Sequence, residues 1–283
     1  MLADLHLHSC CSDGTQTPGQ IAQAAHDLGF GLIALADHNT CQGFEELQKS
    51  CTKLGIGCIR GMEVDCLYDA YELHILAYGF TPGKALAQLA ALSRKLLLQM
   101  SDDLIEKMLP QYPQLSLTEY EAFDYNPTLG GWKGLHYLYT KGVTSTVEAG
   151  MRLYGKFGCD YSSYPFPHVS EVCAAIRESG GIPVLAHPCN WFDAERPQEL
   201  LHHLNALLGF GIGGIECYYP ANTPKMTRLC LDFCRKHQLL ITAGSDSHGD
   251  FSKDHHGISY YLGAVQVSTE KLVLGALANN EAI

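Results

Sequence analysis

The 283-residue sequence lacks several features that would place it in a membrane or on a nucleic acid. No apolar run approaches the roughly 20 residues of a membrane-spanning helix. The N-terminus has no basic segment followed by an apolar one, so we expect no signal peptide and a cytoplasmic protein. Basic residues are few, and the net charge of −11 argues against an extended nucleic-acid surface, whose affinity depends on Lys and Arg.

Cysteine is plentiful, but the spacing of a thiolate zinc site is absent. The 12 cysteines include no C-x-x-C pair, and without a signal peptide we expect reduced thiols rather than disulfides. The remaining composition, 46% hydrophobic and 17% charged, is that of a globular protein with a sizeable core.

Short apolar stretches alternate with amphipathic ones along the chain, which predicts an α/β fold. Strands are expected at 2–8, 31–36, 56–64, 72–79, 182–187, 212–217 and 239–244, with a peripheral eighth near 263–267. Too few residues separate the third and fourth strands for a parallel crossover, so we expect an antiparallel hairpin there.

Residues 81–181 carry mainly helical signals and are too long for a loop. A long helix is expected at 84–109, and capping boxes predict further helix starts at Thr118 and Ser145. We therefore expect one α/β unit, made of 1–80 and 182–283, and a helical insertion, 81–181, that caps its site.

Residues that can bind metal ions lie at the ends of these strands. His6 and His8 are two apart on one strand, so both side chains leave its same face. Asp13 follows in the turn after this strand, and the remaining candidates flank later strands: His38, Glu63, His74, His187, Asp246 and His248. In α/β enzymes strand ends gather at one site, and an unpaired charge buried there is costly. Bound metal ions are the simplest explanation of this pattern.

These residues occur in motifs with a familiar order. The motifs are Asp4-Leu5-His6-Leu7-His8-Ser9, Ser12-Asp13-Gly14, Asp37-His38, Gly61-Met62-Glu63, His74, Ala186-His187-Pro188 and Gly244-Ser245-Asp246-Ser247-His248-Gly249. As a set, running from residue 4 to 249, they resemble the PHP family, named for polymerase and histidinol phosphatase. The resemblance implies a distorted seven-stranded (β/α)7 barrel with three divalent ions in its mouth.

The resemblance also implies which residues hold each ion. One ion would be bound by His6, His8, Glu63 and Asp246, a second by Glu63, His74 and His187, and a third by Asp13, His38 and His248. Mixed imidazole and carboxylate ligands suit Mn, Fe or Zn, and we prefer Mn. A last group is expected to orient the histidines, with structural ion pairing as the alternative: Asp4, Asp37 and Glu216.

Within the family, the chain looks most like the small phosphoesterases that carry a helical insertion after the His74 strand. That similarity implies hydrolysis of a small phosphomonoester, a nucleotide such as AMP or a 3′,5′-bisphosphate. A hydroxide bridging two ions would attack phosphorus in line, so no side chain need be the nucleophile. The alternatives are a 5′–3′ exonuclease on short 5′-phosphorylated RNA or DNA, a histidinol-phosphate-type phosphatase, a C–N hydrolase, and a metal-binding protein without turnover.

The insertion departs from the family at a point where relatives often carry Arg and His. Here the sequence is Leu129-Gly130-Gly131-Trp132-Lys133-Gly134. We expect Trp132 either to stack on a base or to anchor the core, and Lys133 to contact a phosphate. Lys156, Arg60 and Arg177 are lesser phosphate candidates, because most charged side chains are simply solvated. The oligomeric state and the leaving-group acid stay open at this point.

Overall fold

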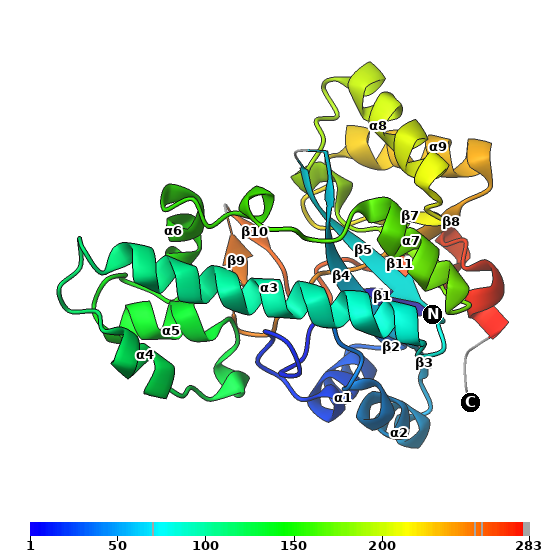
Figure 1. The fold of residues 1–283 in the computed structure, drawn as a ribbon. Coiled ribbons are helices and arrows are strands. Elements are labelled where there is room, and N and C mark those ends of the chain that lie inside the picture. The colour runs from blue at the N-terminus through cyan, green and yellow to red at the C-terminus, as the bar shows by residue number, and fades with distance from the viewer. Residues whose placement is uncertain (70, 252, 256, 280–283) are drawn as a thin grey trace.

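Two β-sheets lie at the centre of the molecule (Figure 1), a computed structural model that describes residues 1–69, 71–251, 253–255 and 257–279. The first has the order β11-β1-β2-β3, with β1 (Leu2–Leu7), β2 (Phe30–Leu35) and β3 (Gly57–Ile59) parallel and β11 (Val267–Ser268) antiparallel. The second has the order β4-β5-β6-β7-β8: β4 (Gly61–Tyr68), β5 (Tyr71–Tyr78), β6 (Ile182–Leu185), β7 (Gly214–Tyr218) and β8 (Leu240–Ala243). β9 (Asp254–His255) and β10 (Ile258–Ser259) form a separate ribbon.

All seven expected strands are present, and the third is divided at Arg60 into β3 and β4. Gly61 begins β4 close to the end of β2, where an added Cβ would overlap the carbonyl oxygen of Leu35. Glycine therefore allows the chain to pass β2 at this distance and to enter the second sheet. In place of the expected eighth strand near 263–267, β11 pairs with the edge of β1.

The two sheets meet where β1 and β2 end, beside the beginning of β4 and the segment that follows β8. β4 and β5 form the expected antiparallel hairpin, and β5 is also antiparallel to β6. Single parallel bridges join the sheets, one between His38 and Glu63 and one between Leu7 and Ser247. The fold is mixed α/β, and its closure into one continuous barrel stays a prediction.

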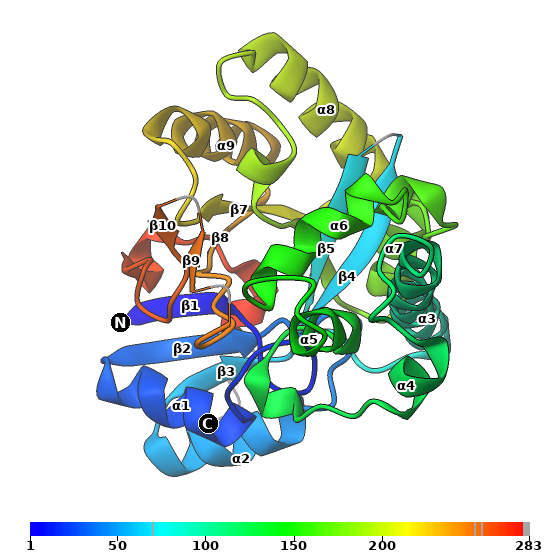
Figure 2. The same cartoon turned by 90° about the vertical axis from the view of Figure 1, so that its left-hand side faces the viewer.

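Helices cover the outer faces of both sheets (Figure 2). α1 (Pro18–Asp27) and α2 (Phe44–Leu54) pack on the first sheet. α7 (Val169–Glu178) and α9 (Pro224–His237) pack on the second, and α8 (Pro197–Phe210) lies against α7. Because the sheets are covered by helices, most strand residues are buried and apolar, and the polar side chains gather where strands end.

The chain from 81 to 181 is mainly helical. The first half of α3 (Lys84–Met108) joins the core of the second sheet through Leu86 and Ala90. Its second half forms a separate apolar cluster with α4 (Leu117–Ala122), α5 (Lys133–Thr140) and α6 (Met151–Lys156), which surround it in Figure 1. No helix among the described residues is both long and apolar enough to span a membrane.

Two helix starts in this region differ from the prediction. α4 begins after Ser116 rather than at Thr118, because the Ser116 hydroxyl accepts a hydrogen bond from the Glu119 amide. Ser145 begins no α-helix; a 3₁₀-helix at Glu148–Gly150 leads into α6 instead. In both places several hydroxyl side chains within a few residues could cap a helix, and the sequence alone does not show which one does.

Candidate metal centre

The nine predicted ligands lie together where the ends of β1, β2 and β8 meet the β4–β5 hairpin. With one further carboxylate they form four overlapping groups whose potential ligand atoms lie within 4.8 Å of one another. The groups are His6, His8, Glu63 and Asp246; Glu63, His74 and His187; His8, Asp13, His38 and His248; and His38, Asp65 and His74. The first three groups contain the three ligand sets that the family resemblance implies.

Glu63 is at the centre of the cluster. Its Oε2 lies 3.3 Å from Nε2 of His6 and from Nε2 of His8. Its Oε1 lies 3.0 Å from Nδ1 of His74 and from Nε2 of His187. Because its two oxygens face different histidine pairs, this buried carboxylate is suited to bridge two ions.

Asp246 faces the same histidine pair from the end of β8. Its Oδ1 lies 3.1 Å from His8 Nε2 and 3.4 Å from His6 Nε2. The Tyr219 hydroxyl donates to its other oxygen at 3.1 Å, which leaves Oδ1 directed at the histidines. This tyrosine is one of the contacts that sequence reasoning missed.

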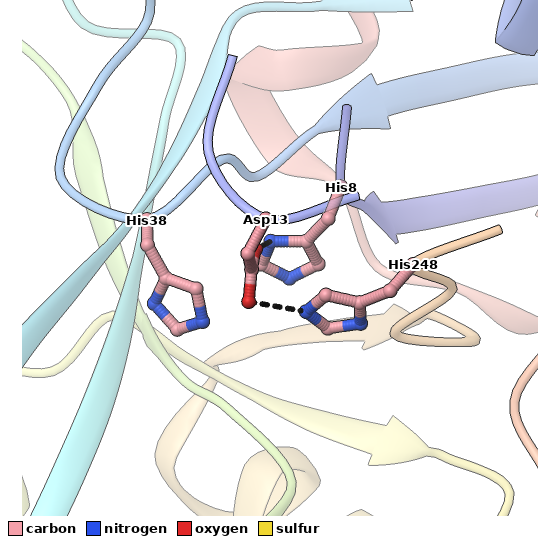
Figure 3. Close-up of side chains that lie close together, drawn as sticks. All are labelled: His8, Asp13, His38 and His248. Atoms are coloured by element: carbon pink, nitrogen blue, oxygen red, sulfur yellow. Dashed lines mark ion pairs between the residues drawn. The ribbon is translucent and has the colours of Figure 1, made fainter. Parts of the chain in front are cut away.

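Figure 3 shows Asp13 beside the rings of His8 and His248, with His38 on the other side of Asp13. Asp13 Oδ1 lies 3.5 Å from His8 Nδ1, and Oδ2 lies 3.3 Å from His248 Nε2. The His8 and His248 rings stack with centroids 4.0 Å apart. His38 Nε2 also lies 3.5 Å from Glu63, so this group is continuous with the central carboxylate.

Asp65 is a member of the cluster that sequence reasoning missed. Its Oδ1 lies 3.2 Å from His38 Nδ1 and 3.2 Å from His74 Nε2, and it accepts from the Tyr161 hydroxyl at 3.1 Å. The available signal was strand periodicity, since Asp65 follows Glu63 by two positions and therefore leaves the same face of β4. Asn39 donates to the other oxygen of Asp65.

Three carboxylates expected to orient the histidines lie behind the cluster. Glu216 accepts from His6 Nδ1 at 3.0 Å and from the His187 amide at 2.9 Å, which leaves His6 Nε2 for a metal ion. Asp4 accepts from the backbone amides of Ser245 and His6, so it ties the β8 end to β1.

Asp37, the third of these carboxylates, holds the loop that leads to Asp13. It accepts from the Ser9 amide, the Ser9 hydroxyl and the Ser12 hydroxyl, each at 2.7 Å. Its side-chain contacts are therefore with the loop rather than with a histidine ring.

The backbone is strained at two of the candidate ligands. His187 has φ 25° and Asp246 has φ 56°, a region that residues other than glycine rarely adopt. Beside them, a Cβ on Gly244 would overlap both the His6 side chain and the Glu216 carboxylate. Strain and close approach of this kind persist where the surrounding structure holds a functional geometry.

Charge coupling within the cluster is strong. Burial disfavours protonation of His38 and His248, but nearby carboxylates outweigh it: Asp65 and Glu63 raise the pKa of His38 to about 10, and Asp13 raises that of His248 to about 9. Burial likewise opposes ionisation of Glu63, yet the surrounding histidines hold its pKa well below the usual range. Without metal, His38 and His248 are therefore imidazolium cations paired with carboxylates at neutral pH.

The donor set fits divalent metal ions. His6 Nε2, His8 Nε2 and Asp13 Oδ1 are buried and have no hydrogen-bond partner among the described residues. Buried polar atoms of this kind are costly unless something binds them. Imidazole nitrogens mixed with carboxylate oxygens are ligands for Mn, Fe or Zn rather than for calcium.

A cavity of about 470 Å³ opens above the cluster. Of the predicted substrate contacts, Trp132 lines it, with its ring 6.1 Å from that of His38. Lys133 does not; its Nζ donates to the Glu121 carbonyl at 3.1 Å and lies over the Tyr120 ring.

The other three predicted phosphate contacts also lie outside the described lining of the cavity. Arg60 lies over the Phe44 ring and Lys156 over the Phe157 ring. Arg177 is in the last turn of α7 beside Gly211. Each of these cations has a local contact that its position in the sequence does not reveal.

The fold and the cluster together define an α/β protein with a candidate metal centre, and similarity to known proteins specifies its class further. Residues 4–130 match the model of the PHP domain. The chain is 27% identical to the phosphoribosyl 1,2-cyclic phosphate 1,2-diphosphodiesterase of Eggerthella lenta, over 90% of this chain and 97% of that protein. It is 26% identical to the 3′,5′-nucleoside bisphosphate phosphatase of Chromobacterium violaceum, over 87% of this chain and 86% of that protein.

The fold also matches that of a solved relative. A Bifidobacterium adolescentis protein assigned as a metal-dependent phosphoesterase superposes with a TM-score of 0.73 at 25% identity, covering 93% of each chain. Residues 4–130 therefore form a PHP domain, and the chain is a metal-dependent phosphoesterase.

Proposed function

We propose that this phosphoesterase hydrolyses a small phosphomonoester, most simply a nucleotide, at a site for three divalent ions with Mn as the preferred metal. The observation that carries the proposal is Glu63, buried among histidines at the base of a cavity of about 470 Å³. A cavity of that size matches a ligand of nucleotide dimensions.

Three sets of side chains would hold the ions: His6, His8, Glu63 and Asp246; Glu63, His74 and His187; and Asp13, His38 and His248. Divalent ions held there would lower the pKa of a water molecule and offset the charge on phosphate oxygens. Glu216 fixes the His6 ring through Nδ1, and Tyr219 fixes Asp246. Asp4 and Asp37 hold the backbone segments that carry His6 and Asp13.

The activities for which two relatives are named support a small substrate. One is named for a nucleoside bisphosphate and the other for a phosphoribosyl cyclic phosphate. The acidic chain, with a net charge of −11, supports the absence of an extended nucleic-acid surface. All 12 cysteines are free thiols, which supports a cytoplasmic location.

A substrate panel tests this proposal. Protein stripped of metal and then reloaded with Mn²⁺ should hydrolyse AMP, while the stripped protein should be inactive. The panel also holds a 5′-phosphorylated oligoribonucleotide, histidinol phosphate and a cyclic amide. Faster turnover of any of these three than of small nucleotides would overturn the proposal and favour the corresponding alternative.

A further inference from the structure

We propose that the leaving-group side of the cavity is a subsite for one uncharged aromatic ring and that it discriminates against a second phosphate. The inference rests on the proposed phosphomonoesterase activity and narrows its substrate class to nucleoside monophosphates and similar aryl-bearing monoesters.

The chain contains two tryptophans, and both line this cavity. Trp132 precedes α5 and its ring centroid lies 6.1 Å from that of His38. Trp191 follows β6 and its ring lies 5.5 Å from His74 and 5.8 Å from His187. Two half-buried indoles from distant parts of the sequence thus flank the histidine cluster. Bases and other planar rings stack on such surfaces.

The segment before Trp132 is built to hold it at the cavity. Gly130 and Gly131 both have positive φ, 72° and 67°, and a Cβ on either would overlap Phe251, which also lines the cavity. The Gly131 amide donates to the Asp13 carbonyl at 2.7 Å, which ties this segment to the metal centre. The Tyr125 hydroxyl donates to the Gly131 carbonyl at 3.0 Å. The Gly-Gly-Trp sequence therefore fixes an aromatic wall beside the cluster.

The same cavity offers no cation for a second phosphate. None of the described residues that line the cavity is Lys or Arg. The residues that the structure does not describe (70, 252, 256 and 280–283) include no Lys or Arg either. Lys133, next to Trp132, is engaged with Glu121 and Tyr120 instead. Metal ions would offset the phosphate that reacts, but any further phosphate would have to lie among uncompensated groups.

Acidic side chains in the lining add repulsion. Glu72 and Asp160 both line the cavity and belong to none of the four ligand groups. Glu72 lies 3.2 Å from His74 Nε2, whereas the side chain of Asp160 accepts from serine hydroxyls and is the main source of this repulsion. Hydrogen bonds from Ser162 and Ser163 lower the pKa of Asp160, so it is ionised at neutral pH. Carboxylates placed against a phosphate select against that partner. The site thus differs in kind from one built for a nucleoside 3′,5′-bisphosphate.

The test compares kcat/KM of the Mn²⁺-loaded enzyme for AMP, ribose 5-phosphate and adenosine 3′,5′-bisphosphate. AMP should exceed ribose 5-phosphate by at least about five-fold, the lower range for stacking one base on an aromatic ring. AMP should also exceed the bisphosphate. Equal values, or a preference for the bisphosphate, would overturn the subsite while leaving the phosphomonoesterase intact. Turnover of none of the three would overturn the proposed function itself, and the subsite with it.

Variants assign the effect to named residues. Trp132→Leu and Trp191→Leu should each lower the ratio of AMP to ribose 5-phosphate, whereas Trp132→Phe should preserve it. The ratio is independent of the fraction of folded enzyme.

Asp160→Asn should raise use of the bisphosphate relative to AMP by about two- to five-fold, the range of one exposed charge pair. Lys133→Met and Tyr139→Leu, which change residues outside the lining, are the matched controls and should leave both ratios unchanged. A fall in bisphosphate use caused by Lys133→Met would overturn the claim that no cation serves this side.

Discussion

The cavity has two faces that differ in where their residues come from. The metal face consists of the nine candidate ligands and Asp65, which lie on β1, β4 and β5 or on the segments that follow β1, β2, β6 and β8. The aromatic face consists of Trp132, Trp191, Tyr161 and Phe251 with side chains of α3 and α6, and all of these lie outside the strands. The sheet frame holds the reactive chemistry, and the helices and loops around it set what reaches that chemistry.

The two faces also differ in how their side chains are held. Those of the metal face are buried charges whose positions depend on one another, so removing one leaves another unpaired. Those of the aromatic face make apolar contacts, and removing one of these contacts weakens packing without leaving a buried charge unpaired. Changes on the metal face should therefore abolish activity, and changes on the aromatic face should alter selectivity.

The largest effect should follow removal of a ligand. Asp246→Ala and His8→Ala should each lose bound metal and more than about a hundredfold of turnover, beyond the range for an outer partner of a metal site. Metal content by mass spectrometry and AMP hydrolysis provide the measurement, with circular dichroism to check the fold. Asp232→Ala on α9, an exposed carboxylate paired with Arg235, is the control. Full metal content and activity in Asp246→Ala would contradict its role.

A smaller effect should follow loss of the groups that hold the ligands. Glu216→Gln and Asp65→Asn keep their size but weaken the contacts to His6, His38 and His74. We expect about 10- to 100-fold weaker metal affinity, with turnover restored at high Mn²⁺. Calorimetric titration of Mn²⁺ measures the affinity. If excess metal does not restore turnover, these two residues do more than position ligands.

pH should act on the metal face through His38 and His248. The pKa values of His38 and His248 in the metal-free fold, about 10 and about 9, exceed the ordinary value of 6.5. Their protonation thus stabilises the metal-free protein fully below about pH 6.5, and this contribution is lost as the pH rises toward 9 and above. Metal ions require the neutral rings, so affinity should rise over the same range.

Thermal unfolding measures both effects of pH, the loss of stability in the metal-free protein and the gain in metal affinity. The Tm of the metal-free protein should fall from pH 6.5 to 9, while the increase in Tm caused by Mn²⁺ should grow. A Mn²⁺-induced increase that shrinks as the pH rises would contradict it. Trp132→Leu, on the aromatic face, should follow the same pH profile as the wild type.

The smallest effect concerns backbone strain on the metal face. At His187, φ 25° should make His187→Gly more stable than His187→Ala by about 1 kcal/mol in the metal-free state, while both lose turnover. Gln238, at φ 55° in the C-cap of α9, is the control: Gln238→Gly should gain similar stability over Gln238→Ala with activity intact. Urea unfolding gives both differences, and equal stability within the His187 pair would contradict strain there.

The metal face was predictable from the sequence to a greater degree than the aromatic face. Its residues interrupt apolar strands at corresponding ends, so strand periodicity and motif order indicate them without a structure. Asp65 shares that signal with Glu63 and was missed because Asp65 belongs to none of the motifs. The division of the third strand at Arg60 was missed because it depends on the contact between Gly61 and Leu35.

On the aromatic face, sequence position indicated Trp132 but not Trp191 or Tyr161. Those two residues are brought to the cavity by long-range packing that no local spacing encodes. The same holds for Lys133, whose contacts with Glu121 and Tyr120 depend on how α4 and α5 pack.

The most direct test is the number of metal ions bound per chain when turnover is maximal. Metal-stripped protein is titrated with Mn²⁺, and bound metal and AMP hydrolysis are measured on the same samples. We expect turnover to rise with occupancy and to reach its maximum at three ions per chain, and we expect Asp246→Ala to bind fewer. Full turnover in protein that holds no metal, or saturation at a single ion, would contradict a shared multi-metal centre around Glu63.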